Sequence, residues 1–404
     1  MAGPFSRSAL VLCLACWAVP ALAADAPVIR NKAQLEAVLA SSQPTPLDAL
    51  TPYGKRSFLR AMRWSETGEP RGFSYLAIVR ELDRQQLASL LAFLDSSEQL
   101  EMFQRQLVGT LLRLPEPSSD IEQRLLEFVR IGEDEAERRN ATATSGASVR
   151  SPTAQLQHYT RLFGKRMDAA ALRRQPLGDL LPLFEAAWRM EFNHPGTALP
   201  DMLRVHQELV TRGVDTRRML DGDVLQALTT MRMFDQARAF AAARPDLGTR
   251  AIPKVEDPLG SRFAGRSLYR YDRAAHTLIR EAAPVPKGTQ VIMVVDAGCR
   301  FSANALAALR ADAGLQARLR EANLLILTPP SSGVPFHFIS EWNAANPSMP
   351  MGVPADLAAW RAIDGDNVPR FFVLKDGKVL GRANGWPEEG NKLALLSLLD
   401  AARD

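Results

Sequence analysis

The chain has 404 residues, of which 46% are hydrophobic and 23% are charged, and its formal net charge is +4 on 49 basic and 45 acidic residues. This length corresponds to about two or three globular domains, and the composition is that of ordinary globular protein rather than of a multi-span membrane protein. No block of Lys or Arg dominates the sequence, so the charge pattern gives no reason to expect a nucleic-acid partner.

The first residues have the three parts of a secretory signal peptide in order. Arg7 lies in a short initial segment, residues 9–19 form an apolar run, and residues 21–23 make a small-x-small cleavage site. The apolar run is too short to span a bilayer. We therefore expect a signal peptide at 1–23, export, most simply to a bacterial periplasm, and no transmembrane segment after cleavage.

Cleavage of this peptide would leave one cysteine. Cys13 and Cys16 lie within it, so Cys299 would be the only thiol of the mature chain. A chain of this size can hold its core without disulfides. A free thiol in an oxidising compartment is unusual, so Cys299 is either buried and inert or chemically used.

The hydrophobic pattern is helical over more than two hundred residues. Three capping-box-like pairs each precede an apolar stripe with i, i+3, i+4 spacing: Asp83 with Gln86, Ser96 with Gln99, and Ser119 with Glu122. They predict a helical domain at 24–138. The small, polar segment 139–154 has no periodicity and predicts a linker.

A second helical domain is expected at 155–245. Its predicted helices lie at 177–190, 199–212 and 223–243. Within the last of these, Met231–Arg238 resembles one half of a tetratricopeptide-type helix pair. Repeat folds need about three copies and only one is found, so a plain bundle helix is the alternative.

The pattern changes after Pro245. Residues 246–261 are rich in Pro and Gly and predict a second linker, and strand periodicity follows from 262. The predicted elements are a hairpin at 267–271 and 276–279, strands at 291–295 and 324–327 around a helix at 301–320, a second hairpin at 371–374 and 379–381, and a final helix at 391–402. Continuous apolar strands around a helix are typical of a parallel unit covered on both faces.

This order resembles the thioredoxin fold over about residues 262–404. The motifs that carry the resemblance are Asp296-Ala297-Gly298-Cys299-Arg300-Phe301-Ser302, Val368-Pro369, and Phe371-Phe372-Val373-Leu374-Lys375-Asp376-Gly377-Lys378. An aspartate three residues before the cysteine is more similar to the periplasmic disulfide-exchange proteins than to cytosolic thioredoxin. The resemblance implies a three-layer α/β domain with a cis Val368–Pro369 bond beside Cys299. It also implies that Val368 and Pro369 bind substrate, and neighbouring Arg300 and Phe301 are candidates for the same role.

The position of Cys299 favours reactivity independently of the family. A cysteine at a helix N-terminus faces unpaired N–H groups and the positive end of the helix dipole, which stabilise a thiolate, and Arg300 adds a positive charge. Ser302 stands where a dithiol enzyme has its second cysteine. Its hydroxyl cannot attack a mixed disulfide at neutral pH, which excludes a self-contained dithiol cycle.

Two hypotheses from different classes therefore stay open, with Cys299 and Ser302 as the candidate catalytic positions. In the first, an exported thioredoxin-like protein exchanges disulfides or captures a protein or peptide client through Cys299, with an external thiol and no cofactor. In the second, a degenerate thioredoxin-like domain serves a non-enzymatic envelope binding or scaffold protein.

Other chemistries fit the residues less well. Cys-x-Phe-Ser is similar to the monothiol glutaredoxins, but Arg300 replaces their glycine. Peroxiredoxins have Thr or Ser where this chain has Asp296. Cys299 has no ligand partner at zinc-site spacing, so we expect no metal. The Pro-rich segment 329–360 is an insertion that either forms a wall of a peptide groove over Cys299 or packs through its own apolar face.

Overall fold

The computed structural model describes residues 27–142, 153–247, 252–365 and 367–402. The predicted signal peptide lies outside these residues, as does most of the predicted linker at 139–154. The chain forms two compact units that divide between Leu107 and Val108, and each is described by itself.

The first unit is a small helical fold with a short antiparallel hairpin. Its elements are α1 (Lys32–Ala40), α2 (Pro52–Arg60), β1 (Arg63–Trp64), β2 (Pro70–Gly72), α3 (Tyr75–Glu81), α4 (Arg84–Phe93) and α5 (Leu100–Phe103). The capping box at α4 is confirmed, because the Asp83 side chain accepts from the Gln86 N–H at 2.8 Å and the Gln86 side chain accepts from the Asp83 N–H at 3.1 Å.

The helix predicted from Ser96 onward is much shorter than expected. Ser96 makes no side-chain cap, because its hydroxyl donates backward to the Leu94 carbonyl at 3.1 Å. In place of one helix, two single turns of 3₁₀-helix flank the four-residue helix α5. A stripe of apolar residues therefore did not suffice to extend a helix that lacked its cap.

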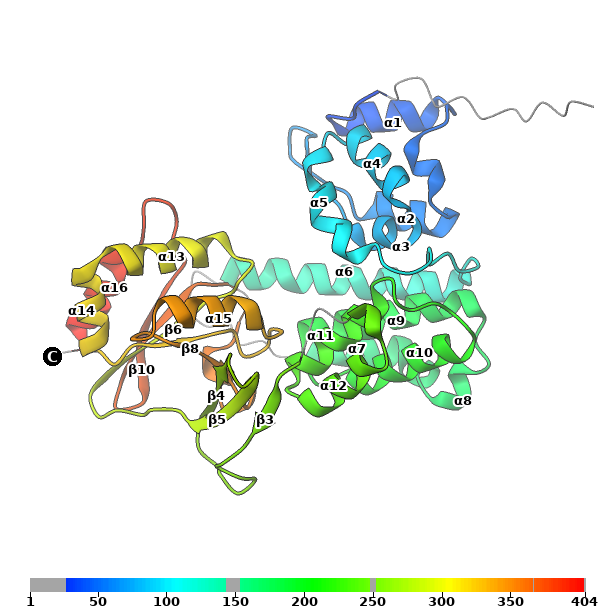
Figure 1. Cartoon of the computed structure of the whole chain (residues 1–404). Coiled ribbons are helices and arrows are strands. Elements are labelled where there is room, and N and C mark those ends of the chain that lie inside the picture. The colour runs from blue at the N-terminus through cyan, green and yellow to red at the C-terminus, as the bar shows by residue number, and fades with distance from the viewer. Residues whose placement is uncertain (1–26, 143–152, 248–251, 366, 403–404) are drawn as a thin grey trace, which may run out of the picture. The chain divides into compact units, whose positions relative to one another are not determined.

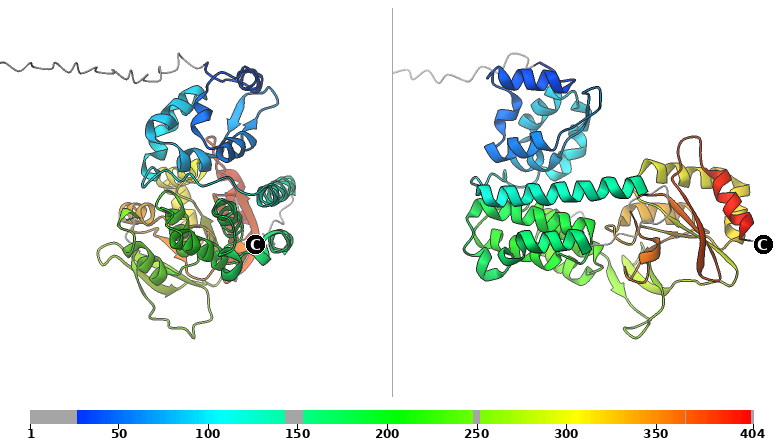
Figure 2. Two further views of the ribbon diagram at one scale, coloured as in Figure 1. Left: turned by 90° about the vertical axis from the view of Figure 1, so that its right-hand side faces the viewer. Right: turned by 180° about the vertical axis from the view of Figure 1, so that it is seen from behind.

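The second unit begins with a bundle of helices. They are α6 (Ser119–Thr142), α7 (Thr153–Phe163), α8 (Ala169–Leu172), α9 (Leu177–Asn193), α10 (Leu199–Thr211), α11 (Leu220–Thr230) and α12 (Phe234–Ala242). The long helix α6 lies along the bundle (Figure 2) and contacts α7 and α9. Its buried residues Ile121, Leu125 and Phe128 belong to the core of this unit. For this reason α6 belongs with the second unit, and the division falls before α6 rather than in the segment 139–154.

Two predicted long helices are each broken into two. The helix expected at 223–243 is interrupted at Arg232, whose φ of 59° is left-handed and cannot continue a helix. The helix expected at 301–320 is interrupted at Asp312, which ends one helix and caps the next by accepting from the Leu315 N–H at 2.9 Å. In each case a backbone feature of one residue overrides a continuous apolar stripe.

The remainder of the second unit is an eight-stranded mixed sheet in the order β10-β9-β6-β7-β8-β4-β5-β3. Its strands are β3 (Lys254–Glu256), β4 (Ser267–Asp272), β5 (Thr277–Ala282), β6 (Thr289–Val294), β7 (Leu325–Leu327), β8 (Met351–Pro354), β9 (Arg370–Lys375) and β10 (Lys378–Asn384). Its helices are α13 (Arg300–Ala311), α14 (Ala313–Glu321), α15 (Phe336–Ala345) and α16 (Lys392–Ala401), which Figure 1 shows beside the strands.

The part of this sheet around β6 has the thioredoxin-like arrangement. Strand β6 pairs in parallel with β7, and the helices α13 and α14 connect the two strands along the chain. On its other side β6 pairs antiparallel with β9. Strands β9 and β10 form the hairpin predicted from the Asp-Gly turn, where Asp376 and Gly377 have φ of 49° and 79°. Helix α16 follows. The strand order and directions therefore define a thioredoxin-like fold for this part of the chain.

The other strands extend the sheet beyond that core. Strand β8 comes from the insertion 329–360 and pairs with β7 and with β4 of the first predicted hairpin. Strand β3 lies in the segment predicted as a linker at 246–261 and pairs with β5. The insertion thus packs into the sheet and core, since Ile339 and Trp342 of α15 are buried.

The two faces of the sheet are covered differently, which departs from a three-layer arrangement. Val291 and Met293 of β6 face a core that contains buried residues of α13, α14, α15 and α16. Ile292 and Val294 face the opposite side, where Trp360 and the following short turn pack. The apolar strand is buried on both faces as predicted, but a single turn of 3₁₀-helix (Arg361–Ile363) rather than an α-helix packs on the second face.

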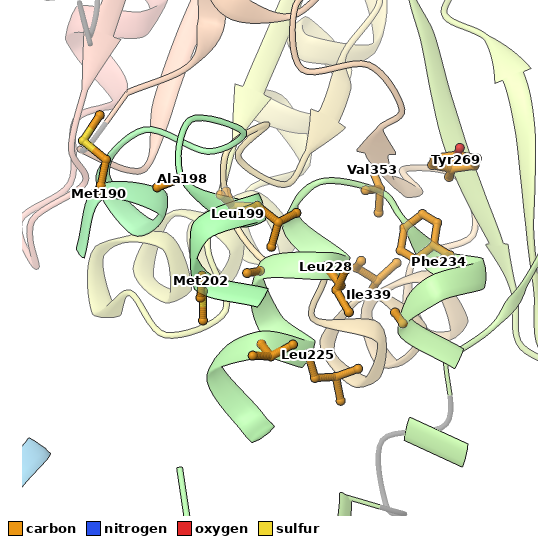
Figure 3. Close-up of a cluster of buried hydrophobic side chains, with 14 of the residues drawn as sticks. Met190, Ala198, Leu199, Met202, Leu225, Leu228, Phe234, Tyr269, Ile339 and Val353 are labelled. Carbon is orange, nitrogen blue, oxygen red and sulfur yellow. The ribbon is translucent and has the colours of Figure 1, made fainter. Parts of the chain in front are cut away.

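The helical bundle and the sheet share one hydrophobic core within the second unit. Figure 3 shows Leu228 of α11 beside Ile339 of α15, and Phe234 of α12 near Tyr269 of β4. The Phe234 and Tyr269 rings meet edge to face at 5.5 Å between centroids. The bundle is therefore joined to the sheet through packed side chains and not only through the chain.

Arg232 fixes this junction with hydrogen bonds to backbone carbonyls. Its guanidinium donates to Pro354 at 2.9 Å, to Ser332 at 3.1 Å and to Pro330 at 3.0 Å, all on the sheet side, and also to two carbonyls at the end of α11. The residue is partly exposed, but protein atoms surround the guanidinium, and this desolvation lowers the pKa of Arg232 to about 10. It stays protonated at neutral pH and satisfies several carbonyls at once.

We expect Arg232→Met to lower the free energy of unfolding by about 2–4 kcal/mol, because it leaves buried carbonyls without donors. Urea denaturation followed by circular dichroism measures the change. Arg262→Met removes an arginine that is exposed on the same unit and serves as the matched control. Equal stability of the two variants would contradict this role of Arg232.

Candidate functional site

The candidate site lies where strand β6 ends and helix α13 begins. Residues Val291–Val295 are buried, so the strand is held in the middle of the sheet. The chain then becomes exposed at Ala297 and Gly298 and enters α13 at Arg300. The core strand thus delivers Cys299 to the surface end of the sheet.

Cys299 is the N-cap residue of α13. Its side chain makes no capping hydrogen bond, and its thiol instead donates to the Val368 carbonyl, with 3.2 Å between Sγ and O. The residue is partly buried and is a free cysteine. The turn before it is held by Asp296, whose carboxylate accepts from the Gly298 N–H at 2.9 Å. The thiol is therefore placed in a defined position on a residue that is only partly buried.

Ser302 serves the structure of this turn. It is wholly buried, and its hydroxyl oxygen accepts from the Asp296 N–H at 3.1 Å. It makes no hydrogen bond to Cys299 among the contacts of the described residues. This arrangement assigns Ser302 the task of closing the strand-to-helix turn, and its predicted position among the catalytic residues has no support from these contacts.

The loop before β9 brings Val368 and Pro369 to the cysteine. The Val368–Pro369 peptide bond is cis, and the Pro369 carbonyl accepts from the Gly385 N–H at 2.8 Å. At its other end the loop is anchored by Asp364, whose carboxylate accepts from the hydroxyl of Ser331 at 2.6 Å. Of the predicted substrate-binding residues, Val368 thus contacts the thiol directly.

Arg300 and Phe301 lie on the exposed side of the site. Phe301 is 44% exposed, which is high for an aromatic side chain, and the Arg300 guanidinium lies 6.0 Å from the centroid of its ring. Such an arrangement offers a flat apolar surface and a positive charge beside the thiol. Both residues are available for contact with another molecule.

The sequence analysis missed the residues that hold this loop. It did not single out Asp364, Gly365 or Arg370, although the polar run at 364–367 directly before Val-Pro is typical of an exposed turn. It also missed that α13 contacts the segment after β10, where the Asn304 amide donates to the Trp386 carbonyl at 3.5 Å. Only pairing of distant strands brings these segments together.

Metal binding and membrane insertion find no support in the described residues. In the part of the chain that the structure describes, no group of three or more His, Cys, Asp or Glu side chains is placed to hold a metal ion. Within the same residues, each helix is too short or too polar to cross a bilayer.

Comparison with known proteins gives only distant structural neighbours. No protein-family model matches the chain, and no curated protein matches it in sequence. A thioredoxin-like protein solved in its oxidised form is 14% identical, with 35% of this chain and 94% of the other covered and a TM-score of 0.26. A thioredoxin-like protein from Bacteroides caccae is 12% identical, with 73% and 99% covered and a TM-score of 0.23.

A third neighbour is the C-terminal domain of an uncharacterised Bacteroides fragilis protein. It is 15% identical, with 34% of this chain and 93% of the other covered and a TM-score of 0.23. Scores this low carry no argument about function. The thioredoxin-like assignment therefore rests on the strand order, the strand directions and the geometry of the site.

We expect Ser302→Ala to lower the free energy of unfolding by about 1–2 kcal/mol, because the Asp296 N–H loses its acceptor. Ser397→Ala, on the exposed side of α16, is the matched control. Alkylation of Cys299 by iodoacetamide should persist in Ser302→Ala at a similar rate, since the hydroxyl does not contact the thiol. Abolished alkylation in a folded variant would instead give Ser302 a part in the chemistry.

Proposed function

We propose that this protein is an exported thioredoxin-like protein that reacts with disulfides through the single thiol of Cys299. The observation that carries the proposal is the placement of this thiol at the N-terminus of α13, 3.2 Å from the Val368 carbonyl and beside exposed Phe301. A peptide client would lie along the backbone at Val368 and contact Phe301 and Arg300. Helix N-termini favour thiolates, which are the reactive form.

The chemistry is a balanced exchange between one thiol and one disulfide. Cys299 releases its proton to solvent, and the thiolate attacks one sulfur of the client disulfide. A bond forms between Cys299 and that sulfur while the client S–S bond breaks, and the leaving client sulfur takes up a proton. An external thiolate then attacks the client sulfur of the mixed disulfide, so that a bond forms between these two sulfurs, the bond to Cys299 breaks, and Cys299 leaves as a thiolate. Ser302 takes no part, because it is buried and its hydroxyl oxygen already accepts a hydrogen bond.

A non-enzymatic binding or scaffold protein is the second candidate. The observation in its favour is that the residue at the position of a resolving cysteine is fully buried and used in the turn. The thiol of Cys299 would then serve only as a hydrogen-bond donor to the Val368 carbonyl. The two candidates differ in whether the sulfur of Cys299 is needed.

The first test uses a defined disulfide. Purified protein is mixed with oxidised glutathione, and the adduct is followed by intact mass. We expect one glutathionyl group on the wild type, removed by dithiothreitol, and none on Cys299→Ser. The adduct should form about tenfold or more faster than on the same chain unfolded in urea, because folding places the thiol at the helix N-terminus. A folded thiol no faster than the unfolded one contradicts the proposal.

The second test asks whether the sulfur matters in the cell. Cells producing the wild type, Cys299→Ser or Ser397→Ala are compared on non-reducing gels and for phenotype. A disulfide-linked client in all except Cys299→Ser supports exchange. The scaffold candidate is favoured if folded Cys299→Ser protein gives the full phenotype and the same bands on non-reducing gels as the wild type.

Export is part of the same proposal and rests on the pattern of residues 1–23. We expect protein purified from its own cells to begin at or near Ala24 and to fractionate with the periplasm. Mass spectrometry of the N-terminal peptide gives the first residue. A chain that keeps Met1 and remains in the cytosol would contradict export while leaving the thiol chemistry open to the glutathione test.

A further inference from the structure

The first residue of β9 is a buried arginine that follows Pro369 directly. Arg370 is 6% exposed, and its two terminal nitrogens donate to the carbonyls of Asp364 and Gly365 at 3.0 and 3.1 Å. A guanidinium is a rigid planar fork, so two bonds to neighbouring carbonyls fix both position and direction. Residues 364 and 365 are therefore tied to the residue that follows Pro369.

Gly365 leaves the room that this contact needs. A Cβ atom at position 365 would lie 2.4 Å from Nη1 of Arg370, which is closer than such atoms approach one another. Any other residue at this position would have to push the guanidinium away. Gly365 and Arg370 thus form a matched pair across the loop.

The backbone of Arg370 is fixed independently of its side chain. In the sheet it lies opposite Val294 of β6 on one side and Asn384 of β10 on the other. The side chain therefore ties the loop to the central strands of the sheet. The same loop carries Val368, whose carbonyl accepts from the Cys299 thiol.

We propose that Arg370 is a positioning residue for the exchange reaction. It ties Asp364 and Gly365 to the start of β9 so that the backbone at Val368 faces both Cys299 and a bound peptide. This inference rests on the proposed function and deepens it, since it makes an extended peptide, rather than a small disulfide, the substrate that depends on the loop. Arg370 itself touches neither the sulfur nor the client.

The test compares two reagents on the same thiol. One is a short synthetic peptide whose single cysteine is joined to 5-thio-2-nitrobenzoate, which is released as a coloured thiolate on exchange. The other is iodoacetamide, which is too small to need the loop. The variants are Arg370→Met, Arg370→Lys and Gly365→Ala, and the matched control is Arg361→Met, an exposed arginine in the preceding turn.

We expect the rate with the peptide to fall roughly 10- to 100-fold in the three loop variants, because misplacement by about 1 Å costs that much. The loss should appear mainly as a higher peptide concentration at half-maximal rate, whereas the rate with iodoacetamide should change little. Arg370→Lys should not rescue the rate, since an ammonium group lacks the fork. Gly365→Ala keeps every atom of Arg370 and the charge, so it tests the contact even if Arg370→Met folds poorly.

The variants are first shown to unfold at the same urea concentration as the control Arg361→Met. Three results in such variants would overturn the inference. One is a peptide rate equal to that of Arg361→Met. Another is an equal fall with both reagents, which would place the effect on the thiol or the fold. The third is full rescue by Arg370→Lys, which would reduce the role to charge.

Failure of the proposed function is seen separately. If wild-type Cys299 reacts with iodoacetamide but not with the peptide disulfide, exchange is wrong. The positioning of the loop is then decided by amide hydrogen exchange at residues 364–368. Faster exchange in Arg370→Met and Gly365→Ala supports it, and unchanged exchange overturns it.

Discussion

The pairing of Val294 with Arg370 is the contact on which the site depends. Strands β6 and β9 are antiparallel neighbours, so the end of one and the start of the other lie at the same edge of the sheet. The segment after β6 carries Cys299, and the segment before β9 carries Val368. Sixty-nine positions separate them in sequence, yet Sγ and the carbonyl oxygen lie 3.2 Å apart. The register of two buried strands therefore places the thiol and the loop that carries Val368 together.

A site with one thiol differs from a dithiol site in the residue that occupies the position of the second cysteine. In the proposed one-thiol reaction the position three residues after the cysteine needs no second thiol, and the Ser302 hydroxyl oxygen there accepts a hydrogen bond from the Asp296 N–H inside the turn. The cost of an unsatisfied buried N–H explains why a small hydrogen-bonding residue suits this position. In the proposed reaction the lifetime of a mixed disulfide depends on thiols from outside the protein and on the loop that holds the client.

The helical bundle of the second unit packs into the same hydrophobic core as the sheet that carries the site. Its core continues into that of the sheet through Phe234, Tyr269 and their neighbours, and Arg232 binds carbonyls on both sides of the junction.

The sequence by itself determined the local features. The alternation of apolar residues, the Asp-Gly turn at 376–377, the capping box at Asp83 and the cysteine at the end of a core strand all depend on neighbours in the chain, and all are found in the structure. Tertiary structure decided where the insertion 329–360 places β8, which helices belong to which unit, and that Arg370 closes the loop facing Cys299. The first two features depend on groups that are tens of residues apart, whereas Arg370 donates to carbonyls five and six residues before it in a turn that has no periodicity. Their partners are chosen by strand pairing, burial and the need to satisfy backbone carbonyls, which periodicity along the chain does not encode.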